Sequence, residues 1–239
     1  MNVVLEIARF DPASGGSPCF VRYAVEAEPT DRILTLLLDI KANHDPTLSF
    51  RKSCAHGVCG SDAVRINGRE RLACKTLVKD VWTDAETPIR IEPLRNMPVQ
   101  RDLMVDQQTF FDKLASVHPY SVNAKPPTEK ERLQTPAEQN KIEDATNCIL
   151  CESCYSACPV LGGGNPAFIG PAACLQAARF DEDSRDEGQV QRRPALDAAT
   201  GVRACDNHFE CTRVCPRGIK VTKHINATKR RLKSQGGGP

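Results

Sequence analysis

Four cysteines between positions 148 and 158 constrain this chain more than any other feature. Cys148, Cys151, Cys154 and Cys158 follow the pattern C-x2-C-x2-C-x3-C, and a proline comes directly after the last of them. At this spacing three thiolates hold one iron–sulfur cubane, while the fourth cysteine, followed by proline, turns away to serve a second cluster. The run therefore predicts a chain that folds around two inorganic clusters.

A second run repeats the spacing with one cysteine missing. The run contains Cys205, Cys211 and Cys215, and a proline directly follows Cys215. His208 stands where the remaining cysteine belongs. The exchange of the proline-linked cysteines predicts two ligand sets. These are Cys148, Cys151, Cys154 and Cys215 for a 4Fe–4S cluster, and Cys158, Cys205 and Cys211 for the other cluster. Three thiolates favour a 3Fe–4S cluster, and a 4Fe–4S cluster with His208 as a nitrogen ligand is the alternative.

A third site lies in the loop before residue 63. Cys54, Cys59 and the distant Cys74 match the spacing of plant-type 2Fe–2S ferredoxins, and Asp62 occupies the place of the third cysteine. Iron accepts oxygen ligands, so Asp62 is predicted to complete the set. The alternatives are that Asp62 only caps a turn or that His56 is the ligand. Cys19 and Cys174 fall outside every motif and are expected to be small buried residues.

Composition constrains the compartment and the partners of a chain with these sites. Twelve cysteines, ten of them at ligand spacings, in a chain that starts without a basic or apolar leader, predict a reducing compartment rather than a disulfide framework. No stretch is apolar enough to span a bilayer, and a net charge of +2 gives no reason to expect nucleic-acid binding. The C-terminal end is nevertheless basic, which indicates a solvated helix end or a contact with anionic lipid.

The pattern of apolar residues predicts an α+β chain with an N-terminal β-grasp domain of the plant-type 2Fe–2S ferredoxin kind and an all-α, bacterial-ferredoxin-like domain. Alternating residues predict strands at 3–7, 21–25, 63–66 and 89–91, and Asp31 is the expected N-cap of a helix over residues 33–40. The predicted domains are residues 1–105 and 137–239, joined by a polar, proline-rich connecting segment at 106–136 that includes Pro126 and Pro127. Residues 181–191 carry too much charge for a core.

With the three sites in this order, the chain resembles the iron–sulfur subunits of succinate dehydrogenase and fumarate reductase, the complex II family. The resemblance covers nearly the whole chain. It rests on the cysteine runs and on the motifs SFRKSC (49–54), GVCGS (57–61), LAC (72–74), PVQRDL (98–103), FIGP (168–171) and DSRD (183–186).

This resemblance implies an electron-transfer subunit of a succinate:quinone oxidoreductase. A separate FAD-containing flavoprotein would oxidise succinate, and electrons would pass through 2Fe–2S, 4Fe–4S and 3Fe–4S clusters to menaquinone or ubiquinone at a membrane anchor, often with haem b. The chain would lie peripherally on the cytoplasmic face of the bacterial inner membrane. No dinucleotide fingerprint or acid–base constellation is evident in the sequence, so turnover of succinate on this chain alone is not expected.

The sequence departs from the family around the quinone. Glycines at 162–164 and Asp206 stand where members that use ubiquinone tend to have tryptophan and histidine, so Pro159, Asp206 and His208 are the residues expected near a quinone. Aspartate at position 62 also occurs in some bacterial succinate dehydrogenases, which favours succinate oxidation. The alternatives are a quinol:fumarate reductase subunit, a soluble multi-cluster carrier and a zinc-binding module.

Overall fold

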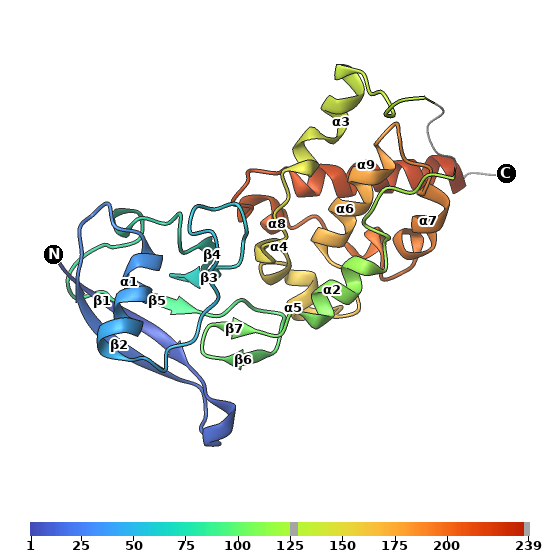
Figure 1. Cartoon of the computed structure of the whole chain (residues 1–239). Coiled ribbons are helices and arrows are strands. Elements are labelled where there is room, and N and C mark those ends of the chain that lie inside the picture. The colour runs from blue at the N-terminus through green and yellow to red at the C-terminus, as the bar shows by residue number, and fades with distance from the viewer. Residues whose placement is uncertain (125–128, 237–239) are drawn as a thin grey trace. The chain divides into compact units, whose positions relative to one another are not determined.

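A five-stranded mixed sheet organises the N-terminal part of the chain in the computed structural model, which describes residues 1–124 and 129–236 (Figure 1). The sheet order is β2-β1-β5-β3-β4, with β1 and β5 parallel and the other neighbours antiparallel. The strands are β1 (Asn2–Arg9), β2 (Cys19–Glu26), β3 (Ala63–Ile66), β4 (Arg69–Leu72) and β5 (Ile89–Glu92). The predicted alternation is confirmed, because Val3, Leu5 and Ile7 of β1 are fully buried.

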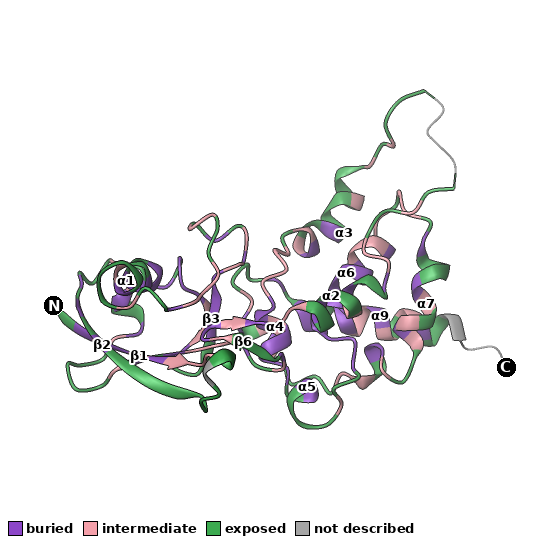
Figure 2. Cartoon of the chain, turned by 60° about the horizontal axis from the view of Figure 1, so that its bottom comes forward, coloured by how far each residue is buried: buried purple, intermediate pink, exposed green. Residues whose placement is uncertain are grey.

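Helix α1 (Ile33–Asp39) packs its apolar face into this core. Ile33, Leu36 and Leu37 are almost fully buried, and such side chains stabilise the fold by about 1.5–3 kcal/mol each (Figure 2). A turn of π-helix, Ile40–His44, follows. The expected N-cap at Asp31 is wrong. Arg32 is the capping residue, and the Asp31 carboxylate instead accepts from the backbone amide of Glu28, because it turns back to the preceding bend.

A second, two-stranded sheet of β6 (Val99–Arg101) and β7 (Met104–Val105) completes this part of the chain. At its turn Asp102 is 2% exposed and has a positive φ of 46°. Its carboxylate accepts from Arg9 Nε (3.0 Å) and from the backbone amides of Phe10 (2.9 Å) and Ser49 (2.8 Å). One buried carboxylate thus joins the end of β1, the start of the cysteine loop and the small sheet.

Residues 149–157 belong to the same compact unit as Met1–Gln107, although they lie far along the sequence. This segment contains the short helix α4 (Ser153–Ser156). Asn96 Nδ2 donates to the carbonyl of Tyr155 (2.9 Å), and Ser156 Oγ donates to Glu70 Oε1 (2.8 Å). The segment that carries two cysteines of the first run is therefore bonded to the loop after β5 and to β4.

The second compact unit, Gln108–Cys148 with Cys158–Pro239, is built from helices in the part that the structure describes. They are α2 (Gln108–Ala115), α3 (Pro136–Thr146), α5 (Pro159–Gly163), α6 (Pro171–Asp181), α7 (Gln189–Asp197), α8 (Glu210–Arg213) and α9 (Val221–Gly236). Short 3-10 turns occur over the chain at Pro12–Ser14, Val78–Asp80 and Val202–Ala204. The expected fold class is confirmed, while the predicted domain boundaries stay predictions. Pro126 and Pro127 of the predicted connecting segment lie outside the described residues.

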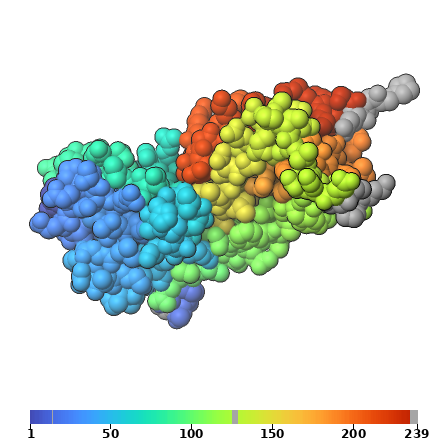
Figure 3. Space-filling model, turned by 45° about the horizontal axis from the view of Figure 1, so that its top comes forward, coloured from blue at the N-terminus to red at the C-terminus, as the bar shows by residue number. Residues whose placement is uncertain are grey.

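Helix α6 is the centre of this unit, and its alanine-rich sequence lets α2, α3, α7 and α9 pack against it. Ala172, Ala177 and Ala178 are buried, because a methyl side chain allows close helix contacts. Helix α3 begins at a capping box, in which Thr135 and Glu138 bond each other's backbone amides. Figure 3 shows α9, in red, beside α3, in yellow-green, where His224 Nε2 lies 3.0 Å from Asp144 Oδ2.

A fully buried arginine fixes the C-terminal side of α6. Arg192 is 0% exposed, and its guanidinium donates to both carboxylate oxygens of Asp186 (2.6 and 2.9 Å) and to Asp181 (3.2 Å). The carbonyls of His118 and Tyr120 accept its remaining bonds. The expectation that residues 181–191 avoid the core is therefore wrong at Asp181 and Asp186, because a buried cation compensates both carboxylates.

We expect Arg192→Met to lower the free energy of unfolding by about 3–5 kcal/mol, because the buried Asp186 carboxylate would lose its counter-charge and Asp181 would keep only Arg231. The shift of the urea midpoint of the full chain measures the effect. Arg203→Met is the matched control, since Arg203 pairs with Asp197 on the surface and exposed pairs contribute about 0–1 kcal/mol. Equal shifts in both variants would contradict the assignment.

Candidate iron–sulfur centres

The loop that enters β3 places Cys54 and Cys59 side by side. Their thiols interact, and the backbone amides of His56 and Val58 point at Cys54 Sγ, with His56 N at 3.4 Å. These amides, that of His56 first, lower the pKa of Cys54 to about 6. Gly57 allows this wrapping because its φ is +80°. A cradle of N–H groups around a sulfur favours the thiolate, which is the form that binds iron.

Asp62 and Cys74 form a second pair. The amide of Cys74 donates to Asp62 Oδ2 (2.5 Å), and the thiol also interacts with that carboxylate. Burial, followed by the effect of Asp62, raises the pKa of Cys74 to about 12. Both residues are almost fully buried, at 4% and 0% exposure. The four predicted ligands of the first site thus stand as two neighbouring pairs.

The second oxygen of Asp62 is the best evidence that this site fits an iron cluster. Oδ1 is buried and has no hydrogen-bond partner within residues 1–124 and 129–236. A buried carboxylate oxygen without a donor costs free energy, whereas a metal ion compensates it. A 2Fe–2S cluster has two irons that each take two protein ligands, which suits two pairs of donors. His56 is exposed and contributes its backbone amide to Cys54.

The cysteines expected for the 3Fe–4S cluster come together in the helical unit. Cys158, Cys205 and Cys211 line one cavity, and the residues predicted near a quinone, Pro159, Asp206 and His208, line it too. Burial raises the pKa of Cys158 and of Cys211, and the neighbouring thiol of Cys205 adds to both shifts. Thiols that raise one another's pKa in this way would be stabilised as thiolates by iron.

Several residues around this cavity escaped prediction from the sequence. Lys229 of α9 donates to the carbonyl of Cys205 (2.5 Å), and Thr222 Oγ1 lies 3.3 Å from Cys211 Sγ. Cys174 is buried as expected. Burial raises its pKa, and the nearby charges of Cys205, Cys211 and Cys158 add to this shift. Cys19, by contrast, is exposed at the start of β2, so the expectation of burial is wrong there. No pattern in the sequence around Lys229 or Thr222 predicts these contacts.

The predicted 4Fe–4S set stays a prediction from the cysteine spacing. Cys151 and Cys154 belong to the first unit, and Cys148 and Cys215 belong to the second. Within the first unit, the backbone of Gly60 lies against Cys151: a Cβ atom at Gly60 would come within 2.6 Å of Cys151 Cβ and 2.9 Å of its Cα. The loop of the first site therefore touches the segment that carries Cys151.

None of these sets resembles a site for one metal ion. In the described part of the chain, no three His, Cys, Asp or Glu side chains converge as ligands of a single ion would. Cluster ligands surround a core of several atoms and stand further apart than the ligands of one ion, so this finding agrees with the pairs and the cavity described above. No disulfide joins any of the twelve cysteines, all of which lie in the described part of the chain.

Comparisons with known proteins agree with this arrangement. Residues 4–112 match the family model of a 2Fe-2S iron-sulfur cluster binding domain, and residues 144–219 match that of a 4Fe-4S dicluster domain. The chain is 42% identical to the fumarate reductase iron-sulfur subunit of Mycobacterium tuberculosis, over 99% of both chains. It is 36% identical to the succinate dehydrogenase iron-sulfur subunit of Paracoccus denitrificans, over 93% of this chain and 85% of that protein.

Among solved structures, a chain of the Mycobacterium smegmatis Sdh1 complex in the apo form is similar. It superposes with a TM-score of 0.85 at 25% identity, over 100% of this chain and 98% of that chain.

Asp62 variants test the assignment of the first site. We expect Asp62→Cys to keep two irons in this loop, because it restores the four-thiolate set, and Asp62→Ala to lose them. Iron per chain and the EPR signal of the dithionite-reduced protein measure the outcome. Asp84→Ala is the control, because that carboxylate is exposed and accepts bonds from its own turn. A full 2Fe–2S signal in Asp62→Ala would contradict a ligand role.

Gly60→Ala tests the close approach to Cys151. Gly60 and Gly68 both have positive φ, +73° and +78°, so alanine costs about 1–2 kcal/mol at either position. Nothing lies within 4 Å of a Cβ at Gly68, whereas at Gly60 the new atom would collide with backbone. We expect Gly60→Ala to lower the urea midpoint clearly more than the control Gly68→Ala. Equal losses would mean that the loops do not touch in solution.

Proposed function

Because this chain belongs to the family of iron–sulfur subunits of succinate dehydrogenase and fumarate reductase, we propose that it carries electrons between a flavoprotein and a membrane quinone. The observation that carries the proposal is that, in a chain of this family, each unit brings a group of partly or fully buried cysteines together. Cys54, Cys59, Asp62 and Cys74 would hold 2Fe–2S, and Cys158, Cys205 and Cys211 would hold 3Fe–4S. Cys148, Cys151, Cys154 and Cys215 would hold 4Fe–4S.

The chain's own residues position these groups and set their environment. When bound, each cluster supplies a centre that takes up one electron and gives it up again. The amides of His56 and Val58 stabilise charge on Cys54 Sγ, and Gly60 lets the first loop lie against the segment of Cys151. Close contact matters, because electron transfer slows steeply with distance. The oxidation or reduction of the dicarboxylate belongs to the flavoprotein subunit.

We further propose that the helical unit faces the membrane partner, with Pro159, Asp206 and His208 near the quinone. They line the cavity of Cys158, Cys205 and Cys211, and all three are exposed. No helix among the described residues is long and apolar enough to cross a bilayer. Contact with the membrane at the cytoplasmic face would therefore involve anchor subunits or lipid headgroups.

Succinate oxidation is the direction that we propose first, on the strength of the aspartate at position 62. Quinol-dependent fumarate reduction is the second candidate, because relatives at 42% and 38% identity carry that name. The reduction potentials of the clusters and of the bound quinone separate the two directions.

Anaerobic purification with co-expressed partners tests the function. We expect about nine irons per chain, and a low-temperature EPR signal from the oxidised protein, because a 3Fe–4S cluster is paramagnetic in that state. Cys211→Ser should abolish this signal, whereas His208→Ala, the matched variant in the same cavity, should keep it. Loss of the signal in His208→Ala would make His208 a ligand. About four irons or fewer, or zinc in their place, would overturn the proposal.

A further inference from the structure

Glu152 is a buried carboxylate that the proposed electron relay does not use. It follows Cys151 directly, and it is 2% exposed. Its φ of 66° lies in the left-handed region, where a glycine would be free of the strain that a side chain causes. A strained and buried glutamate at this position indicates that the side chain makes interactions that offset both costs.

The known partners of Glu152 satisfy only part of its carboxylate. The amide of Gln107 donates to it, and the Arg51 guanidinium acts on it through its charge, while burial raises its pKa. Oε1 is buried and has no hydrogen-bond partner in the described ranges 1–124 and 129–236. Buried carboxylate oxygens in proteins are nearly always bonded to a donor. Oε1 therefore needs a donor that the described residues do not supply.

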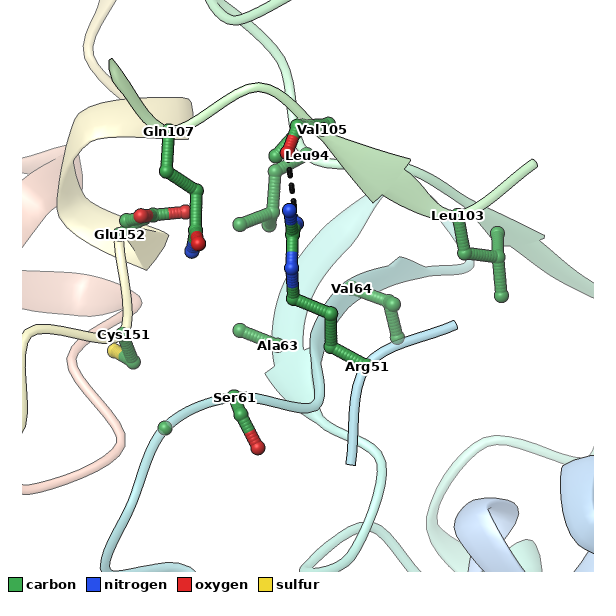
Figure 4. Close-up of a pocket in the computed structure, with 11 residues that line it drawn as sticks. Arg51, Ser61, Ala63, Val64, Leu94, Leu103, Val105, Gln107, Cys151 and Glu152 are labelled. Carbon is green, nitrogen blue, oxygen red and sulfur yellow. Dashed lines mark hydrogen bonds between the residues drawn. The ribbon is translucent and has the colours of Figure 1, made fainter. Parts of the chain in front are cut away.

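A cavity adjoins this carboxylate. Its volume is about 20 Å³, and Arg51, Gln107 and Glu152 contribute polar side chains to its lining (Figure 4). Leu94 and Leu103 contribute to an apolar wall. A space of about 10–15 Å³ accommodates one water molecule, provided that two to four polar groups surround it. The cavity fits one water by both criteria and is too small for a larger ligand.

Arg51 has donors left for such a ligand. Its Nη1 donates to the carbonyl of Val105 (2.7 Å) and its Nη2 to Gln100 Oε1 (3.1 Å), which leaves part of its five N–H groups for other acceptors. Figure 4 shows the Arg51 side chain beside the space, with Glu152 and Gln107 next to each other across from it. A water between them can accept from Arg51 and donate to Glu152.

We infer that this cavity is a specific site for one ordered water molecule, which bridges the Arg51 guanidinium and Glu152 Oε1. The bridge joins the loop that leads to Cys54 to the residue after Cys151 by buried hydrogen bonds, beside the contact of Gly60 with Cys151. The water site itself needs no cluster, whereas its place between two ligand loops rests on the proposed function.

A crystal structure of the cluster-loaded full chain at about 1.8 Å or better tests the site. We expect one water within hydrogen-bond distance of both Glu152 Oε1 and the Arg51 guanidinium. A cavity without density, a bound cation, a direct bond between Arg51 and Glu152, or a Glu152 side chain turned to solvent would each overturn the inference.

Two variants separate the water from the space that holds it. Glu152→Gln keeps polar atoms at the end of the side chain, so we expect the water to remain. Glu152→Met has a similar length and no strong acceptor, so we expect the water to be lost. Retention of the water in Glu152→Met would show that Glu152 does not hold it. Iron content and EPR of the crystallised protein test the proposed function separately. A cavity without water in iron-loaded protein would therefore contradict this inference and leave the proposed function intact.

Discussion

The hydrogen bond from the Cys74 amide to the Asp62 carboxylate is the interaction on which the first site depends. It fixes the end of β4 against the start of β3, and it leaves the other carboxylate oxygen buried and without a donor. A cysteine at position 62 would need no such arrangement, because a thiol is much less costly to bury than a carboxylate. The bond would therefore orient Asp62, the proposed hard oxygen ligand, in a place that usually takes sulfur.

Buried carboxylates join distant segments throughout this chain. Asp102 bonds three segments of the first unit, Glu70 receives the hydroxyl of Ser156, and Asp186 pairs with Arg192 in the second unit. Aromatic residues make up only 5% of the sequence, so packing between aromatic rings contributes little to holding the loops. Polar bonds of this kind are directional, and they hold loops in one conformation more strictly than apolar contacts do.

The sequence predicted the features that depend on local spacing. The α+β fold class, the helix at residues 33–40 and the family follow from periodicity and motifs, and all are confirmed. Features that depend on tertiary partners were not predictable. Asp31 resembles an N-cap but bonds the preceding bend, and Asp181 is buried because Arg192 lies one helix away. The burial of Glu152 could not be predicted from the sequence, because most residues around it come from segments about 45–100 residues away.

The basic C-terminal end shows how structure changes the meaning of a charge pattern. Lys220, Lys223, Lys229, Arg230, Arg231 and Lys233 are the six cations of this segment. Two of them serve the unit itself, since Lys229 bonds the carbonyl of Cys205 and Arg231 pairs with Asp181. The other four are exposed and are available to an anionic surface. In α9, Lys229 bonds the loop of Cys205, while Lys223, Arg230 and Lys233 are exposed. An anionic surface that bound these exposed cations would therefore act on the helix that supports the cavity of Cys158, Cys205 and Cys211.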